Sequence, residues 1–239
     1  MNGRHVPLRI GAALALAGVL VISPQTHPPT ASALTVFSDT FSSASFAAWT
    51  GTINMSIDPG TGRAAPPSAR AQATSSQAFA YKLLPAAMGT ICMSANVNAT
   101  SLGTGQTVAL IRLRTAANSS VARVYLSSTG TLSLKSDVSD AQRASGVALG
   151  TGWHGIELCG AVGTSGSWDL YRDGTRIVNG WLANTGTTPV GRVEIGDNGA
   201  KTFTINFDDV LVTDTHQAAD TDPPTTPGMS VRRLIPTVI

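Results

Sequence analysis

Few residues in this chain have the types and spacing that covalent catalysis or metal binding requires. His154 and His216 have no partner at catalytic or ligand spacing. Cys92 and Cys159 have no histidine or third cysteine near them in the sequence, which argues against a metal centre and against a nucleophilic thiol. The sequence contains neither a phosphate-binding loop nor the G-x-S-x-G motif of serine hydrolases. These residues alone therefore name no reaction.

The N-terminus has the order of a secretory signal peptide. Arg4 and Arg9 precede the apolar run 10–22, and small residues end in Ala31-Ser32-Ala33. A membrane anchor is the alternative, but the apolar run is shorter than the roughly 20 residues that span a bilayer. We therefore predict a signal peptide over residues 1–33, a secreted or cell-surface protein, and no membrane span in the mature chain.

Export changes the interpretation of the two cysteines. Cys92 and Cys159 lie in the strand-like runs 91–97 and 156–162. Outside the cell such a pair usually oxidises, so we expect a disulfide; two buried thiols are the alternative.

The composition favours an all-β domain. Charged residues make up 13% of the 239 residues, and the segments after the N-terminus lack the helical period of apolar positions. Short alternating runs instead recur every eight to twelve residues, roughly the spacing of a sandwich or barrel. The net charge of +2 comes mainly from scattered arginines, which argues against nucleic-acid binding. We also expect separate short strands at 68–74 and 78–84, and again at 191–197 and 202–214.

Two turns fix the register of two predicted hairpins. Arg172 should pair with Thr175 across Asp173-Gly174, and Val124 with Leu134 across a three-residue loop. The first register puts Trp168, Leu170 and Ile177 on the core face. The opposite faces of the two hairpins each carry a tyrosine beside charged residues: Arg123, Tyr125, Ser133 and Lys135 in one, and Asp169, Tyr171, Arg176 and Val178 in the other.

Four blocks of sequence carry a resemblance to a known family. They are DTFSSASFAAW at 39–49, WHGIELC at 153–159, WDLYRDGT at 168–175 and INFDDVLV at 205–212. Residues 34–215 resemble a concanavalin A-like, or laminin-G-like, jelly-roll domain. The resemblance implies a two-sheet antiparallel sandwich with few or no helices. Residues 216–239 are rich in Pro and Thr, resemble the entry linker to a fibronectin type III module, and are expected to be a poorly ordered linker and tail.

The resemblance also implies where a glycan would bind. Members that bind glycans hold them on the concave sheet or at loops along one edge, and a sugar ring commonly stacks on an exposed aromatic side chain with polar neighbours. Tyr125 and Tyr171 fit this role, with Arg123, Lys135, Asp169 and Arg176 beside them. Ordinary half-exposed sheet tyrosines are the alternative. Three of the four tryptophans, Trp153, Trp168 and Trp181, are expected in the core.

Some relatives of this fold hydrolyse glycosides, which requires two carboxylates about 5 to 9.5 Å apart. The clustered acids E-x-D-x-x-E of the laminarinase-like branch are missing, since the only two glutamates, Glu157 and Glu194, lie far apart in the sequence. Asp197 follows Glu194 closely, but the last acid of the cluster is lost. We therefore predict no enzymatic activity, and Glu194 with Asp197 is the one pair to test.

Jelly rolls of this kind often hold a structural calcium ion between their first and last strands. Asp39, Asp208 and Asp209 supply the carboxylate oxygens that Ca²⁺ prefers. Alternatively, Asp208 and Asp209 cap an edge or meet an arginine at the surface.

Together these features predict a secreted, non-catalytic carbohydrate-binding module whose partner is an extracellular polysaccharide or glycan. A structural or adhesive spacer of a cell-surface assembly is the alternative, and an atypical glycoside hydrolase is the third possibility.

Overall fold

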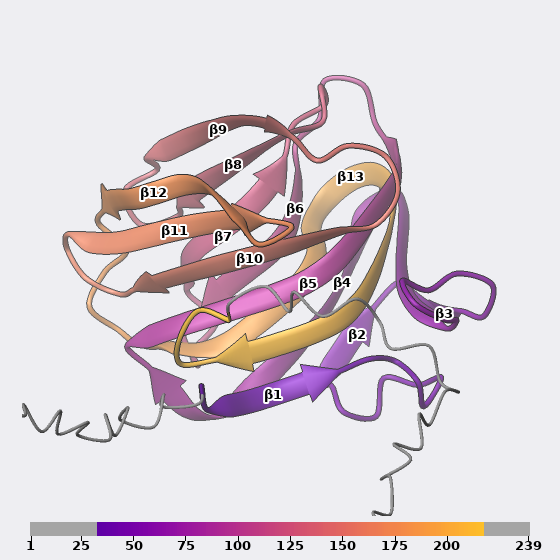
Figure 1. The fold of residues 1–239 in the computed structure, drawn as a ribbon, viewed down its shortest axis with the longest axis horizontal. Helices are drawn as coiled ribbons and strands as arrows, with labels where there is room; N and C mark the ends of the chain where they lie inside the picture. The colour runs from indigo at the N-terminus through magenta and orange to yellow at the C-terminus, as the bar shows by residue number, and fades with distance from the viewer. Residues whose placement is uncertain (1–32, 218–239) are drawn as a thin grey trace, which may run out of the picture. The chain divides into compact units, whose positions relative to one another are not determined.

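The computed structural model describes residues 33–217, and they form antiparallel strands without a helix (Figure 1). The predicted all-β class is thus confirmed. No helix among these residues is long and apolar enough to cross a membrane. The predicted signal peptide and the tail beyond Gln217 lie outside the described residues. The strands are β1 (Thr35–Asp39), β2 (Gly51–Ile53), β3 (Met55–Asp58), β4 (Ser68–Met88), β5 (Thr90–Leu102), β6 (Val108–Arg114), β7 (Ser120–Leu126), β8 (Thr131–Ser136), β9 (Gln142–Ala148), β10 (His154–Ala161), β11 (Gly166–Arg172), β12 (Thr175–Ala183) and β13 (Val190–Thr213).

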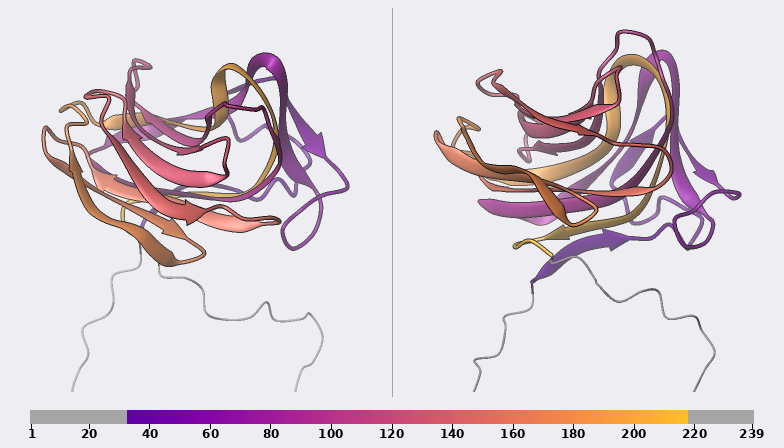
Figure 2. Two further views of the ribbon diagram at one scale, coloured as in Figure 1. Left: turned by 90° about the horizontal axis from the view of Figure 1, so that it is seen from above. Right: turned by 45° about the horizontal axis from the view of Figure 1, so that its top comes forward.

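The strands form two layers that share two long bent strands (Figures 1 and 2). In layer one the order is β2, the second half of β4, the first half of β13, then β6, β7, β8 and β9. In layer two it is β12, β11, β10, β5, the second half of β13, the first half of β4, and β3. β1 also pairs with the end of β13, so the first and last strands of the domain lie side by side.

The four short strands expected at 68–74, 78–84, 191–197 and 202–214 are wrong, because each pair is one continuous strand. β4 and β13 stay hydrogen-bonded to each other on both sides of a shared bend. Gly196 takes a φ of +87° at the bend of β13. A Cβ there would lie 2.3 Å from the carbonyl oxygen of Ala78, so only glycine allows the two strands this close approach.

The predicted hairpin registers are confirmed at both turns. Arg172 pairs with Thr175, and Val124 pairs with Leu134. One expected face is wrong: Val178 lies in the core, opposite Leu170, and not on the polar face. The reason is that the register of β11 and β12 shifts on both sides of Leu170, which changes the face of the residues that follow.

The core lies between the two layers. Trp168 is 1% exposed and packs there as expected, and Trp181 packs against the core while partly buried. Trp153 is different, since it lies half-buried beside a surface cavity of layer two. Trp49 is also buried and donates a hydrogen bond from Nε1 to Asp39.

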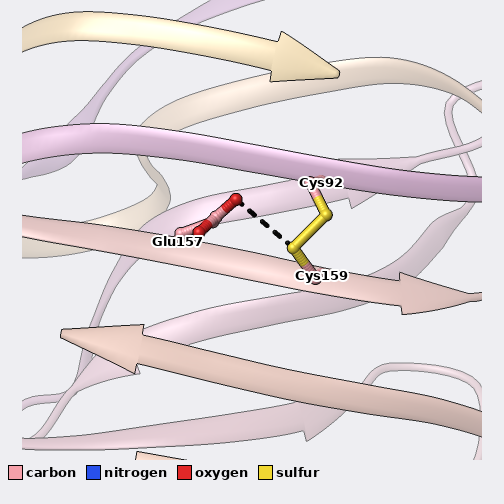
Figure 3. A group of neighbouring side chains, drawn as sticks. All are labelled: Cys92, Glu157 and Cys159. Carbon is pink, nitrogen blue, oxygen red and sulfur yellow. Dashed lines mark hydrogen bonds between the residues drawn. A yellow bond between two sulfur atoms is a disulfide. The ribbon is translucent and has the colours of Figure 1, made fainter. Parts of the chain in front are cut away.

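The predicted disulfide between Cys92 and Cys159 is present and links β5 to β10 at directly opposite positions (Figure 3). Glu157 lies 3.4 Å from the sulfur of Cys159. A disulfide sulfur has no proton to donate, so this is a contact rather than a hydrogen bond. Because both sulfurs are oxidised, the three side chains cannot act as a thiolate metal site.

A buried amide ties β3 to β13 in layer two. Asn206 is 3% exposed and donates hydrogen bonds from Nδ2 to Asp58 and to Ser68. The bond from Asn206, with the N–H of Gly60, lowers the pKa of Asp58 below its ordinary value. The charged form of this carboxyl is therefore favoured in the folded state.

Removing the disulfide should destabilise the domain. The double variant Cys92→Ala/Cys159→Ala frees a long loop in the unfolded chain, and on the chain-entropy model this lowers the free energy of unfolding by about 4 kcal/mol. Chemical denaturation measures the change. A reducing agent should lower the stability of the wild type equally and leave the double variant unaffected; a change below about 1 kcal/mol would contradict the expectation.

Acid should weaken the tie between β3 and β13. A carboxyl whose folded pKa is lowered contributes stability that is present above its unfolded pKa, about 3.9, and is lost as the pH falls through the folded value. The stability difference between wild type and Asp58→Asn should therefore shrink as the pH falls below about 4. Denaturation curves across this range test the prediction. Asn206→Ala removes the main cause of the pKa shift, so in that background the stability difference made by Asp58→Asn should be smaller.

Candidate functional site

A row of polar residues crosses layer one on the face turned away from the core. The row joins six neighbouring strands, because each residue is paired directly with the next across the sheet. Its members, which we call the polar row, are Tyr81, Glu194, Arg112, Arg123, Lys135 and Gln142. Three cations therefore stand side by side on β6, β7 and β8. Like charges at directly opposite positions destabilise a sheet, so this arrangement costs stability unless anions offset it.

A cavity of about 290 Å³ opens over the cationic part of the row, and we call it the groove. Cationic side chains predominate over its single carboxylate, that of Asp197. The residues that line the groove are Thr107, Ala109, Arg112, Arg123, Tyr125, Lys135, Gln142, Asp197, Asn198, Gly199 and Lys201. The groove therefore combines positive charge, one aromatic ring and several uncharged hydrogen-bonding groups.

Arg112 is the deepest cation of the groove and is 4% exposed. It donates a hydrogen bond from Nη1 to the side-chain oxygen of Asn198, while its Nε is buried and has no partner. Burial lowers the pKa of Arg112, and the neighbouring Asp197 opposes this shift. Asp197 nevertheless forms no salt bridge with it, because its two oxygens accept hydrogen bonds from the backbone N–H groups of Ala109 and Gly199, at 2.6 and 2.7 Å.

Three other polar side chains of the groove have partners within the chain. Lys135 forms a salt bridge with Asp140, whose side chain is 82% exposed. Nε of Arg123 lies 3.2 Å from Asp137, within salt-bridge distance but at an angle that makes no hydrogen bond. The half-buried Tyr125 donates a hydrogen bond of 2.6 Å to Gln142.

The six predicted glycan-binding residues divide between two faces of the molecule. Arg123, Tyr125 and Lys135 lie together in the groove of layer one. Asp169, Tyr171 and Arg176 lie on the outer face of layer two, on β11 and β12. The two groups therefore cannot form one site, although the sequence pattern around each tyrosine is alike.

The predicted binding residues of layer two contact other residues of the same chain. Tyr171 is 5% exposed, and its ring stacks on that of His216 with the centroids 3.9 Å apart. Burial raises the pKa of Tyr171, with a further contribution from Asp169. Asp169 accepts a hydrogen bond from the N–H of Gly180, which has a φ of +57°. Asp169 thus holds the irregular part of β12, and its position has a structural explanation.

His216 and its neighbour also reach Glu157. Nδ1 of His216 lies 2.7 Å from one oxygen of Glu157, and the N–H of Gln217 donates to the other. The segment that follows β13 therefore lies over the outer face of layer two. A cavity of about 750 Å³ on this face borders Trp153, Tyr171 and Gln217.

Glu194 and Asp197, the one acid pair proposed for hydrolysis, both have structural partners. Glu194 is 1% exposed and forms salt bridges with Arg192, at 2.6 Å, and with Arg114, at 3.6 Å. Arg192 also stacks over the ring of Tyr81, with its guanidinium carbon 3.7 Å from the centroid. Each of the two carboxylate oxygens of Glu194 therefore already meets a guanidinium group of the chain.

The three predicted calcium ligands do not gather in the described part of the chain. Asp39 uses its two oxygens for the N–H of Phe41 and the indole of Trp49. Asp208 and Asp209 meet Arg63, Asp208 through the backbone N–H and Asp209 through the guanidinium at 3.5 Å. The one close trio of possible side-chain ligands among these residues is that of Figure 3. The donor set does not fit a shared calcium site, and calcium binding stays a prediction.

Sequence reasoning missed several residues of the groove. Arg112 is the clearest omission. It lies between apolar residues in the strand-like run of β6, just as Arg123 does in that of β7. Asn198 and Lys201 lie at the bend of β13, which was predicted to be a break between two strands. The alternation could have found Arg112, but no local pattern brings the bend of β13 to β6.

Comparisons with known proteins support the fold. No family model matches the sequence, and no curated protein matches it either. Among solved structures the chain is similar to a cellulose-induced protein, Cip1, with a TM-score of 0.60 and 15% identity over 75% of this chain and 97% of that one. It is also similar to an endo-β-1,4-glucuronan lyase from the fungus Trichoderma reesei, with a TM-score of 0.55 and 9% identity over 78% of this chain and 98% of that one.

A third similar structure is the binding domain of botulinum neurotoxin serotype D, with a TM-score of 0.53 and 9% identity over 76% of this chain and 48% of that one. At these identities the likeness shows the all-β sandwich fold alone, because one fold supports many functions.

Glu194 should act as a structural anchor. Glu194→Gln leaves two arginines without their carboxylate, and breaking a buried ion pair in this way costs about 3 to 5 kcal/mol of unfolding free energy. Chemical denaturation measures this loss. The matched variant Asp140→Asn removes an exposed partner and should cost far less, because solvent screens an exposed ion pair. A stable Glu194→Gln protein that had lost turnover of a β-glucan would contradict this role and favour hydrolysis.

Proposed function

We propose that this chain is an exported, non-catalytic module that binds a glycan in the groove of layer one. The observation that carries the proposal is the position of Tyr125 in a cavity lined by hydrogen-bonding side chains. An aromatic ring with polar neighbours is the usual physical basis of sugar binding. Gln142 and Asn198 offer amide groups that match the hydroxyls of a sugar ring.

The similar structures support this proposal at the level of the fold. They include a cellulose-induced protein and a toxin binding domain. The disulfide of β5 and β10 supports export, since such bonds persist in oxidising compartments.

Two alternatives remain separable by experiment. A structural spacer of a cell-surface assembly would show no affinity for any glycan. The glucuronan lyase among the similar structures keeps an enzymatic role open. Incubation with the bound polysaccharide, followed by analysis of its chain length, distinguishes a binding module from an enzyme.

Tyr125→Ala should weaken glycan binding. Loss of the ring removes a stacking surface worth about 0.5 to 1.5 kcal/mol, so the dissociation constant should rise roughly twofold to thirteenfold. Affinity electrophoresis against soluble polysaccharides identifies a ligand, and titration calorimetry measures the change. Tyr125→Phe keeps the ring and loses only the hydrogen bond to Gln142, so it should retain most of the affinity.

Tyr171→Ala distinguishes the two faces. It removes the tyrosine of layer two, which already stacks on His216. If Tyr171→Ala lowers the affinity and Tyr125→Ala does not, the glycan binds to layer two and the groove is the wrong face. If no polysaccharide binds at millimolar concentration, the spacer alternative is favoured.

A further inference from the structure

The groove contains more positive charge than the fold itself requires. Arg112, Arg123 and Lys135 face one another on adjacent strands, where like charges repel. The arginines of a purely structural network would be expected to alternate with acids, as Arg114 and Arg192 do around Glu194. The three-cation stretch is therefore a local cost to stability, and such costs concentrate at functional sites.

Arg112 is the cation that contributes most to this destabilisation. Within the described residues it forms no salt bridge, although the other two cations of the stretch each have a carboxylate partner. It is almost fully buried, and its Nε has no hydrogen-bond partner. Asp197 and Glu194 act on this guanidinium without a salt bridge to it, and a buried cation that has no direct carboxylate partner suits an anion that comes from outside the chain.

Resting on the proposed function, we propose that the groove selects an acidic glycan, and that Arg112 with Arg123 and Lys135 binds its anionic groups while Tyr125 contacts a sugar ring. Lys201 adds a fourth cation at the bend of β13. Guanidinium groups form charge-assisted hydrogen bonds with carboxylate and with other oxyanions, and these bonds are stronger than those with hydroxyls. A carboxylate of a uronic acid and a sulfate ester share this chemistry.

The positions of the carboxylates around the three cations also fit an anion-binding groove. Lys135 and Arg123 pair with Asp140 and Asp137, which lie outside the lining of the groove. Asp197, the carboxylate inside it, is held by backbone N–H groups and so does not occupy Arg112. An arriving anion would therefore meet a guanidinium that no carboxylate of the described chain has already bound.

The experiment compares one polymer with and without its charge. Polygalacturonate and its carboxyl-reduced form differ only in the anionic group, and dextran sulfate with dextran makes the same comparison for sulfate. We expect the wild type to bind one acidic polymer at least about tenfold more tightly than its neutral counterpart, the effect of one charge-assisted hydrogen bond. The pair that shows the preference identifies carboxylate or sulfate as the group recognised.

Arg112→Met should abolish the preference and keep the fold. Replacing this buried cation by an apolar side chain of similar length removes its desolvation cost and also its hydrogen bond to Asn198, so the melting temperature should change little. Arg63→Gln removes the same charge from an exposed position beside Asp209 and should keep the preference. If Arg112→Met fails to fold, Lys135→Gln is tested in its place. The partner of Lys135, Asp140, is exposed, so this substitution leaves no unpaired charge in the interior.

The outcomes separate this inference from the proposed function. Equal binding of charged and reduced polymers, or of neutral glycans alone, overturns the acidic preference and leaves glycan binding standing. Binding of no polymer overturns both. Equal losses for Arg112→Met and Arg63→Gln, or equally tight binding of inorganic polyphosphate, would mean a general polyanion surface and would also overturn the inference.

Discussion

The hydrogen bonding of β13 with β4 through a shared bend is the constraint on which the rest of the structure depends. Both strands contribute to both layers, so their pairing fixes how the layers meet. Gly196 allows the bend because a side chain there would collide with Ala78. The bend also brings residues 197–201 to the start of β6, where Asp197 accepts the N–H of Ala109. The groove exists because this irregular stretch closes one side of a regular sheet.

The regular part of layer one determines which side chains meet in the groove. Alternation along each strand places every second residue on the outer face, and the pairing register then aligns them into the polar row. At one end of the row an acid balances two arginines, and the stretch next to it contains only cations. Backbone geometry alone does not demand this order of charges. This order of charges is the observation from which the acidic-glycan preference is proposed.

The sequence predicts the local features of this domain well and the distant ones poorly. The hairpins at Asp173-Gly174 and at residues 128–130 follow from turn chemistry and alternation, and both registers are correct. The disulfide follows from the predicted export and from two strand-like runs. The bends of β4 and β13 resemble ends of strands, because serines mark the first and glycines mark the second. The meeting of Arg112 with Asn198 depends on chain segments far apart in the sequence, and no local pattern reports it.

The two tyrosine-bearing faces show how similar patterns acquire different roles. Tyr125 and Tyr171 each alternate with apolar residues and have charged neighbours, so the sequence treats them alike. In layer two the segment after β13 crosses the outer face, and His216 stacks on Tyr171 while it contacts Glu157. In layer one, within the described residues, the ring of Tyr125 borders an open cavity. The two rings therefore differ in exposure: Tyr171 is buried under His216 although a cavity of about 750 Å³ borders it, whereas Tyr125 is half-buried.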